Sequence, residues 1–129
     1  TNIFLIMIKS TIHELRLHPS PFKKIKAGIK TIEMRLWDEK RRLMNVGDKI
    51  IFFKRSEEFE SITCTIKMLH FFPSFMVMCE TLSLERMGYE GEGLRAWLEH
   101  HDHGMSRYYS PDDENRYGVV GIEIQKDFV

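Results

Sequence analysis

The sequence has little cysteine and no long hydrophobic run. Its 129 residues include two cysteines, Cys64 and Cys79, which form no CxxC motif and no disulfide framework. Cys64 alternates with apolar neighbours, so we expect a small buried hydrophobe. The longest strongly apolar stretch, residues 3–8, is far shorter than the roughly 20 residues that a membrane-spanning helix needs. These scarcities predict a reducing, cytoplasmic compartment and no membrane partner.

The length and the even composition predict one domain. A chain of this size can bury a continuous core by itself, and no linker or composition break divides it. The chain starts at Thr1, Met7 would serve as an alternative start, and residues 1–8 lack the basic flank of a signal peptide. We therefore expect residues 1–11 to be an N-terminal extension or short strand, and residues 12–129 to be a single domain.

The formal net charge of zero argues against a protein that coats nucleic acid by bulk charge. The charge is nevertheless segregated along the chain. Residues 23–42 carry three acidic side chains against eight basic ones, which are Lys23, Lys24, Lys26, Lys30, Arg35, Lys40, Arg41 and Arg42. Such a local excess can steer an anionic ligand to one place. A solvated helix face followed by a charged loop would have the same composition.

Alternating hydrophobicity predicts strands over residues 13–17, 31–37, 49–54, 62–69 and 117–125. Helix starts are predicted at Ser20 and Ser110, each followed by proline, and after Pro73. Apolar residues at helical spacing indicate an amphipathic helix over residues 91–101. The aromatic residues around Pro73 are expected to form a barrel lid or core, namely Phe71, Phe72 and Phe75. The pattern predicts an α+β fold, a small mixed β-barrel of about five to six strands with short helices in the connections.

The segment GIKTIEMR, residues 28–35, is the most informative part of the chain. Glu33 and Arg35 lie two apart on a predicted strand, so both point to the face opposite the apolar residues. Lys30 is expected at the mouth of this strand, after the glycine turn. On spacing alone, an exposed Glu–Arg pair on a sheet surface is the more usual arrangement.

This segment fits the G-x-K-x-x-E-x-R signature of the ASCH domain (activating signal cointegrator homology), a relative of the PUA-like RNA-binding barrels. The segments HELRLHPSPFKKIKAG, LWDEKRRLMNVGDKIIFF, LHFFPSF and YYSPDDENRYGVVGIEI are also similar to parts of that family. Their order and spacing extend the resemblance from about residue 12 to residue 125. We identify the chain on this pattern as a member of the family.

The resemblance implies an RNA-binding or nucleotide-binding cleft beside the signature strand. Lys30 would offer a point charge to phosphate, and Arg35 a planar fork for phosphate or a base edge. Glu33 would hold Arg35 in place and accept hydrogen bonds from the ligand. We expect a part in RNA metabolism or in translation-linked regulation.

Four further residues are candidate ligand contacts. Arg41 and Arg42, which follow Trp37, could extend the anionic track, although solvated loop charges are an equal alternative. Tyr108 and Tyr109 resemble an aromatic pair of the family and are candidate platforms for stacking on a base, while at least one of the two is expected in the core. The partner expected from these residues is RNA or a nucleotide or nucleoside, and the pattern specifies no oligomeric state.

An enzyme is the alternative. Some small ASCH proteins resemble amidohydrolases that deacylate N-acetylcytidine and use the signature lysine with a threonine three residues later. This sequence has Lys30 but carries Glu33 at the threonine position, and Thr31 is two positions away from it. Lys30 and Glu33 are therefore the candidate catalytic residues of a general acid–base variant, either an amidohydrolase or an RNA-processing, ribonuclease-like enzyme.

A histidine cluster, residues 100–103, has the spacing of a helical metal site only at His100 and His103. Gly104 indicates that the helix ends there, and no Cys or His partner lies at a recognisable spacing elsewhere. We predict neither a bound metal nor a cofactor.

Overall fold

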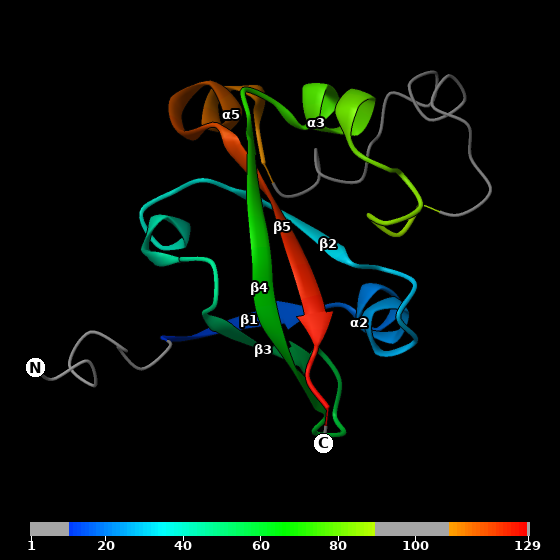
Figure 1. Cartoon of the computed structure of the whole chain (residues 1–129). Helices are drawn as coiled ribbons and strands as arrows, with labels where there is room; N and C mark the ends of the chain where they lie inside the picture. Colours follow the sequence, from blue (N-terminus) through cyan, green and yellow to red (C-terminus); the bar gives the residue numbers. More distant parts are fainter. Residues whose placement is uncertain (1–10, 90–108, 129) are drawn as a thin grey trace, which may run out of the picture.

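Five strands form one curled sheet in the computed structural model, which describes residues 11–89 and 109–128 (Figure 1). The strand order is β1-β3-β4-β5-β2, where β1 pairs with β3 in parallel and the other neighbours are antiparallel. The strands are β1 (Ile12–Leu17), β2 (Ile32–Leu36), β3 (Lys49–Lys54), β4 (Ser61–Phe72) and β5 (Val119–Lys126). The predicted α+β fold with a small mixed β-barrel is confirmed.

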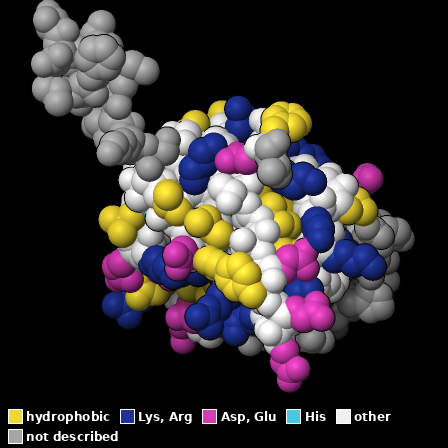
Figure 2. All heavy atoms as spheres, turned by 90° about the horizontal axis from the view of Figure 1, so that it is seen from below, with side chains coloured by type: hydrophobic (Ala, Val, Ile, Leu, Met, Phe, Trp, Pro, Cys, Tyr) yellow, Lys and Arg dark blue, Asp and Glu magenta, His cyan; other side chains and the backbone are white. Residues whose placement is uncertain are grey.

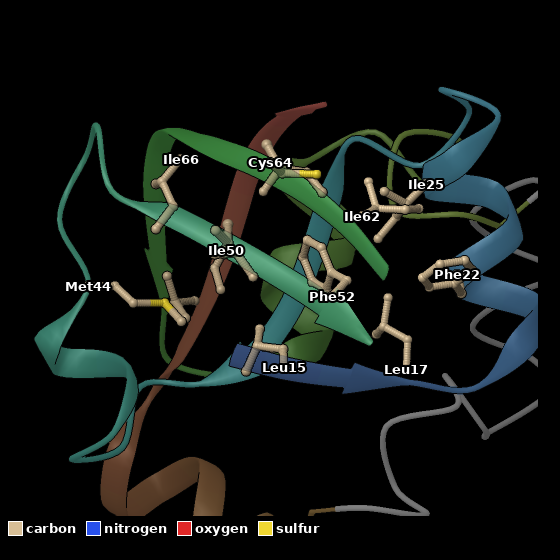
Figure 3. Close-up of a cluster of buried hydrophobic side chains, with 13 residues drawn as sticks. Leu15, Leu17, Phe22, Ile25, Met44, Ile50, Phe52, Ile62, Cys64 and Ile66 are labelled. Atoms are coloured by element: carbon tan, nitrogen blue, oxygen red, sulfur yellow. The ribbon is translucent and has the colours of Figure 1, made fainter. Parts of the chain in front are cut away.

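The inside of the curled sheet is lined by every second residue of its strands. Figure 3 shows the side chains of β1, β3 and β4 converging with those of helix α2 (Pro19–Lys26) on one interior. Ile50, Phe52 and Cys64 have no exposed surface there. Burial raises the pKa of the Cys64 thiol to about 12, so it acts as a small hydrophobe, as the alternation predicts.

A second core lies on the outer face of β2. Ile32, Met34 and Leu36 pack there against helix α3 (Phe75–Thr81) and the segment that follows it. Among the aromatic residues predicted as lid or core, Phe75 is fully buried and Phe72 is partly buried, but Phe71 is 55% exposed. Phe71 is therefore not a core residue, because it lies at the end of β4 beside Trp37, although the register shift between Ile66 and Met68 gives it the same inward face as Leu69.

Short helices connect the strands, and the structure shows how each of them begins. Ser74 accepts a hydrogen bond from the Val77 amide, and Ser110 forms a capping box with Asp113 at the start of α5 (Pro111–Tyr117). The expected cap at Ser20 is wrong, because α2 begins at Pro19 with His18 as its N-cap and no side-chain cap. Proline is preorganised for the first helical turn, so Pro19 moves the start upstream of the serine.

The charged segment after β2 forms a single 3-10 turn, η1 (Arg41–Leu43). The predicted helix over residues 91–101, the histidine cluster, Tyr108 and nearly all of the predicted N-terminal extension lie outside the described residues. Within the described ranges, none of the helices has the length and apolar character needed to span a membrane.

Candidate functional site

The two outer strands of the sheet, β1 and β2, face each other across a seam. An arginine bridges this seam, since Arg35 Nη2 on β2 donates to the carbonyl oxygen of Arg16 on β1 at 3.1 Å. A cavity of about 540 Å³ opens beside this bridge and takes lining residues from both strands. The seam therefore positions the cleft at the place where the signature strand has no neighbouring strand.

Glu33 is the centre of a buried charge network in the cleft wall. Its Oε2 accepts from Arg35 Nε at 3.1 Å and from Arg35 Nη2 at 2.9 Å. Its Oε1 accepts from the Met34 amide at 3.2 Å and lies 3.3 Å from Lys30 Nζ. Lys30 and Glu33 are each 5% exposed, so the sheet-surface alternative for the Glu–Arg pair is not what the structure has.

Lys30 lies after the Gly28 turn and just before β2, as predicted, and its side chain is buried in the cleft wall. Its ammonium donates to the carbonyl oxygens of Ile32 at 2.8 Å and Met87 at 2.9 Å, in addition to its contact with Glu33. An ammonium group has three protons, and these three oxygens account for them. Lys24 donates in the same way to the Gly88 carbonyl at 2.6 Å. Lys30 therefore links Met87 to the start of β2, and Lys24 links Gly88 to helix α2.

The network shifts the pKa of each of its three ionisable groups, and it favours the charged forms of Glu33 and Arg35. Burial acts to raise the pKa of Glu33, but the charges of Arg35 and Lys30 outweigh it and hold that pKa below its ordinary value. Burial acts to lower the pKa of Arg35, and the opposing effects of Glu33 and Tyr109 leave it raised. Burial lowers the pKa of Lys30, which Glu33 only partly opposes. Glu33 is thus a firmly ionised carboxylate that holds Arg35.

The cleft as a whole is basic. Its described lining carries the cations Arg16, Lys24, Lys30, Arg35 and Arg55 against Glu33 as the single carboxylate, an excess of four positive charges. The rest of the lining includes apolar side chains such as Leu17 and Met87, and the rings of Tyr89 and Tyr109. Basic and acidic side chains are interspersed over the face seen in Figure 2. In the described lining of the cavity, basic side chains outnumber acidic ones, although the chain as a whole is neutral.

Sequence reasoning missed Arg16 and Arg55 as cleft residues. The alternation in residues 13–17 assigns Arg16 to the polar face of its strand but does not say what that face borders. Arg55 reaches the seam because β3 runs parallel to β1, and its amide donates to the Leu17 carbonyl at 2.7 Å. A parallel pairing of strands that are far apart in sequence has no local signal.

The predicted contact residues divide into two groups. Tyr109 lines the cleft with Lys30, Glu33 and Arg35, and its ring stacks on Phe75 with centroids 5.6 Å apart. Arg41 and Arg42 are not among the described cleft residues. Arg41 pairs with Asp38 at 3.2 Å, and Arg42 donates to the carbonyl oxygens of Trp37 and Tyr117. The structure therefore separates these two arginines from the signature residues.

A small α+β barrel with a basic cleft at its seam is a PUA-like domain in its fold class. The chain belongs to the ASCH domain family, whose model matches residues 15–128. An ASCH domain implies, in general, a PUA-like fold of the RNA-binding kind. This agrees with the resemblance found in residues 28–35.

Solved structures give the same fold. The hypothetical protein PH0355 is 31% identical, with a TM-score of 0.74, and the match covers 91% of this chain and 100% of that one. PF0455 from Pyrococcus furiosus is 28% identical, with a TM-score of 0.63 and coverage of 90% and 97%. EF3133 from Enterococcus faecalis V583 is 14% identical, with a TM-score of 0.52 and coverage of 96% and 86%, and is similar in fold alone. No curated protein matches this chain.

Proposed function

We propose that the protein binds RNA or a single nucleotide in the seam cleft, through the network of Lys30, Glu33 and Arg35. The observation that carries this proposal is the excess of four positive charges around a cavity that also offers apolar and aromatic surface. The positive charges can pair with phosphate, and the flat apolar surface can stack on a base. We further propose that the protein acts in the cytoplasm, in RNA metabolism or translation-linked regulation.

The cleft residues would have different roles in binding. Lys30 and Glu33 use their hydrogen bonds on one another, on Arg35 and on the backbone, so they are suited to orienting Arg35. Arg35 offers a planar guanidinium held in one position, which suits a base edge or a phosphate. Arg16 and Arg55 are exposed at the rim and are suited to the flanking phosphates.

The size of the cavity favours a single unpaired nucleotide. Its volume of about 540 Å³ lies in the range of small-molecule sites, roughly 300–1,000 Å³, and a duplex would not enter it. Single-stranded RNA, with bases free to leave the strand, is therefore the favoured polymeric ligand.

Binding is favoured over catalysis at the two candidate catalytic residues. The protons of Lys30 are engaged by three oxygens, and the lowered pKa of Glu33 makes it a weak base. Glu33 also stands where the amidohydrolase pattern has threonine. We expect purified protein not to deacylate N-acetylcytidine. A turnover above about 1 per second that Lys30→Ala abolishes would establish the enzyme instead.

The test of binding is the affinity of an Arg35→Lys variant for labelled single-stranded RNA, measured by fluorescence anisotropy. This change keeps the charge and removes the planar fork, so we expect affinity to fall by about tenfold or more. Arg86→Lys is the matched control, because Arg86 pairs with Glu123 at 3.0 Å and is not a described cleft residue. Wild-type affinity in the Arg35→Lys variant would show that the cleft does not bind the RNA.

A further inference from the structure

A second hollow, of about 410 Å³, lies where β2 ends and β4 and β5 meet. Its described lining is largely aromatic and includes Trp37, Phe71, Phe72 and Tyr117. We propose that this aromatic hollow binds a second nucleobase of the same single strand that occupies the seam cleft. This inference rests on the proposed function and names the ligand more closely, as a single-stranded oligonucleotide of more than one residue.

Phe71 is the side chain that suits a stacked base. It is 55% exposed although it is a large apolar ring, and its ring meets Trp37 edge-on, with centroids 4.7 Å apart and an interplanar angle of 63°. Phe71 pairs with Val120 and shares the inward face of Leu69, but it lies at the end of β4, where its ring stays exposed. The exposed ring of Phe71, supported by the partly buried Trp37, offers a flat apolar surface on which an unpaired base can stack.

Arg42 supplies the charge that distinguishes a nucleotide from an apolar protein segment. Its Nε donates to the Trp37 carbonyl at 2.7 Å and its Nη2 to the Tyr117 carbonyl at 3.3 Å, so it is tied to two residues of the hollow. Its guanidinium carbon lies 6.0 Å from the centroid of the Trp37 ring, and the residue is exposed. A cation fixed at the rim of an aromatic hollow is complementary to a base with its phosphate.

The two sites are connected along one strand. Glu33 and Arg35 share a face of β2, and Trp37 follows with the same parity directly after the strand ends. Two residues of extended chain span about 7 Å, so the backbone of Arg35 and that of Trp37 are close neighbours. Figure 1 shows β2 leading from α2 toward the side where η1 and α5 lie. A single-stranded RNA that leaves the seam cleft along β2 would reach the aromatic hollow next.

The test compares a short ligand with a long one. We expect Phe71→Ala to weaken binding of a ten-nucleotide oligouridylate about five- to one-hundredfold, the range for loss of one stacked base. Binding of uridine 5′-monophosphate should be unchanged, because it occupies the seam cleft alone. Phe59→Ala is the matched control, since Phe59 is also an exposed ring in an aromatic pair, with Phe53, and lies outside both hollows. It should change neither affinity.

A spectroscopic measurement gives a second readout. The chain has two tryptophans, so Trp97→Phe leaves Trp37 as the only one. In that variant the oligouridylate should quench tryptophan fluorescence by stacking near Trp37, whereas the mononucleotide should not. Quenching by the oligonucleotide that Phe71→Ala abolishes would support the proposal directly.

The outcomes separate the two proposals. If the oligouridylate binds wild type and Phe71→Ala equally, the second site is refuted while the seam cleft stands. If neither ligand binds the wild type, both proposals fall. If Phe71→Ala instead converts a dimer to a monomer in sedimentation and leaves RNA affinity unchanged, the hollow is an interface between copies of the chain and the second site is refuted.

Discussion

Arg35 and Arg42 are the same residue type, seven positions apart, in two different settings. Each donates to the carbonyl oxygen of a distant segment, Arg35 to Arg16 and Arg42 to Tyr117. Arg35 is largely buried and shares a buried carboxylate, whereas Arg42 is exposed on the turn η1. Removing the partner of a buried charge costs far more than changing an exposed one. Substitutions in the buried network at the seam should therefore lower stability more than a substitution of the exposed Arg42.

The largest expected effect comes from removing the carboxylate at the seam. Glu33→Ala leaves Lys30 and Arg35 as buried charges without a counter-ion, so we expect the free energy of unfolding to fall by about 3–5 kcal/mol. Asp38→Ala removes the partner of Arg41 and an acceptor for its amide beside η1, and should cost about 1 kcal/mol. Chemical denaturation measures both. Equal losses would show that the buried network is no more valuable than the pair beside η1.

Lowering the pH should test the contribution of the buried carboxylate at the seam. The pKa of Glu33 is lowered in the folded state, so its stabilisation is complete above the unfolded carboxyl pKa of about 4.3. This stabilisation is lost as the pH falls through the lower folded value. We expect the unfolding free energy of the wild type to decrease more steeply with falling pH below that point than that of Glu33→Gln.

Denaturation at a series of pH values between 6 and 2 makes this comparison, because the other carboxylates titrate alike in both proteins. Parallel curves for the wild type and Glu33→Gln would mean that the Glu33 pKa is the same in the folded and unfolded states. The buried network would then contribute no pH dependence.

Two glycines allow a matched test of backbone strain. Gly88 (φ +98°) lies beside the cleft lysines, and Gly47 (φ +94°) precedes β3, with nothing within 4 Å of an added Cβ. Alanine at either position should cost about 1–2 kcal/mol, since L-residues disfavour a positive φ. Only Gly88→Ala should also weaken RNA binding, by a few-fold, because relief of its strain moves the carbonyl oxygens that hold Lys24 and Lys30.

Thermal unfolding gives the stability changes and anisotropy gives the affinities. A loss of affinity in Gly47→Ala equal to that in Gly88→Ala would indicate a general loss of folded protein. It would remove the special position of residues 87–88 at the seam.

The smallest effect on folding is expected at η1. The double variant Arg41→Ala/Arg42→Ala should change stability by about 1 kcal/mol, because Arg42 is exposed and Asp38, the partner of the partly buried Arg41, keeps contact with water when Arg41 is removed. For wild type we expect a shallow log–log salt slope of about −2 to −3 on single strands, and the double variant should flatten it by one or two units for all sequences alike. Salt titrations of RNA affinity check this. An unchanged slope would show that these arginines contact no phosphate.

The strands and two of the helix caps follow from local patterns. Alternation in residues 49–54 and 62–66 marks the buried faces of β3 and β4, because half of a strand must leave water. After Ile66 the alternation fails, because the register shift leaves Met68 47% exposed. Ser74 and Ser110 cap their helices because a side-chain oxygen satisfies a free amide at each start. Ser20 does not, since Pro19 takes the first helical turn. Local chemistry is predictable where no neighbouring residue competes for the same position.

The three signature residues of the cleft could be picked out from the sequence, but their burial and the other lining residues could not. The resemblance of residues 28–35 picks out Lys30, Glu33 and Arg35, and the structure brings them together. The burial of Lys30 depends on the Met87 carbonyl, which is 57 residues away, and Arg16 joins the cleft through the curvature of the whole sheet. Alternation records which face of a strand is buried, but it does not record which strand or loop lies opposite.

The seam between β1 and β2 also bears on how such a barrel changes over evolutionary time. A backbone ladder is made by almost any residue, so it persists through nearly every substitution. The bridge from Arg35 to the Arg16 carbonyl exists only while one codon specifies arginine. A substitution at this single position therefore removes the contact that bridges the opening. A substitution there can change the opening of the cleft, and with it the ligand, while every hydrogen bond between the paired strands is kept.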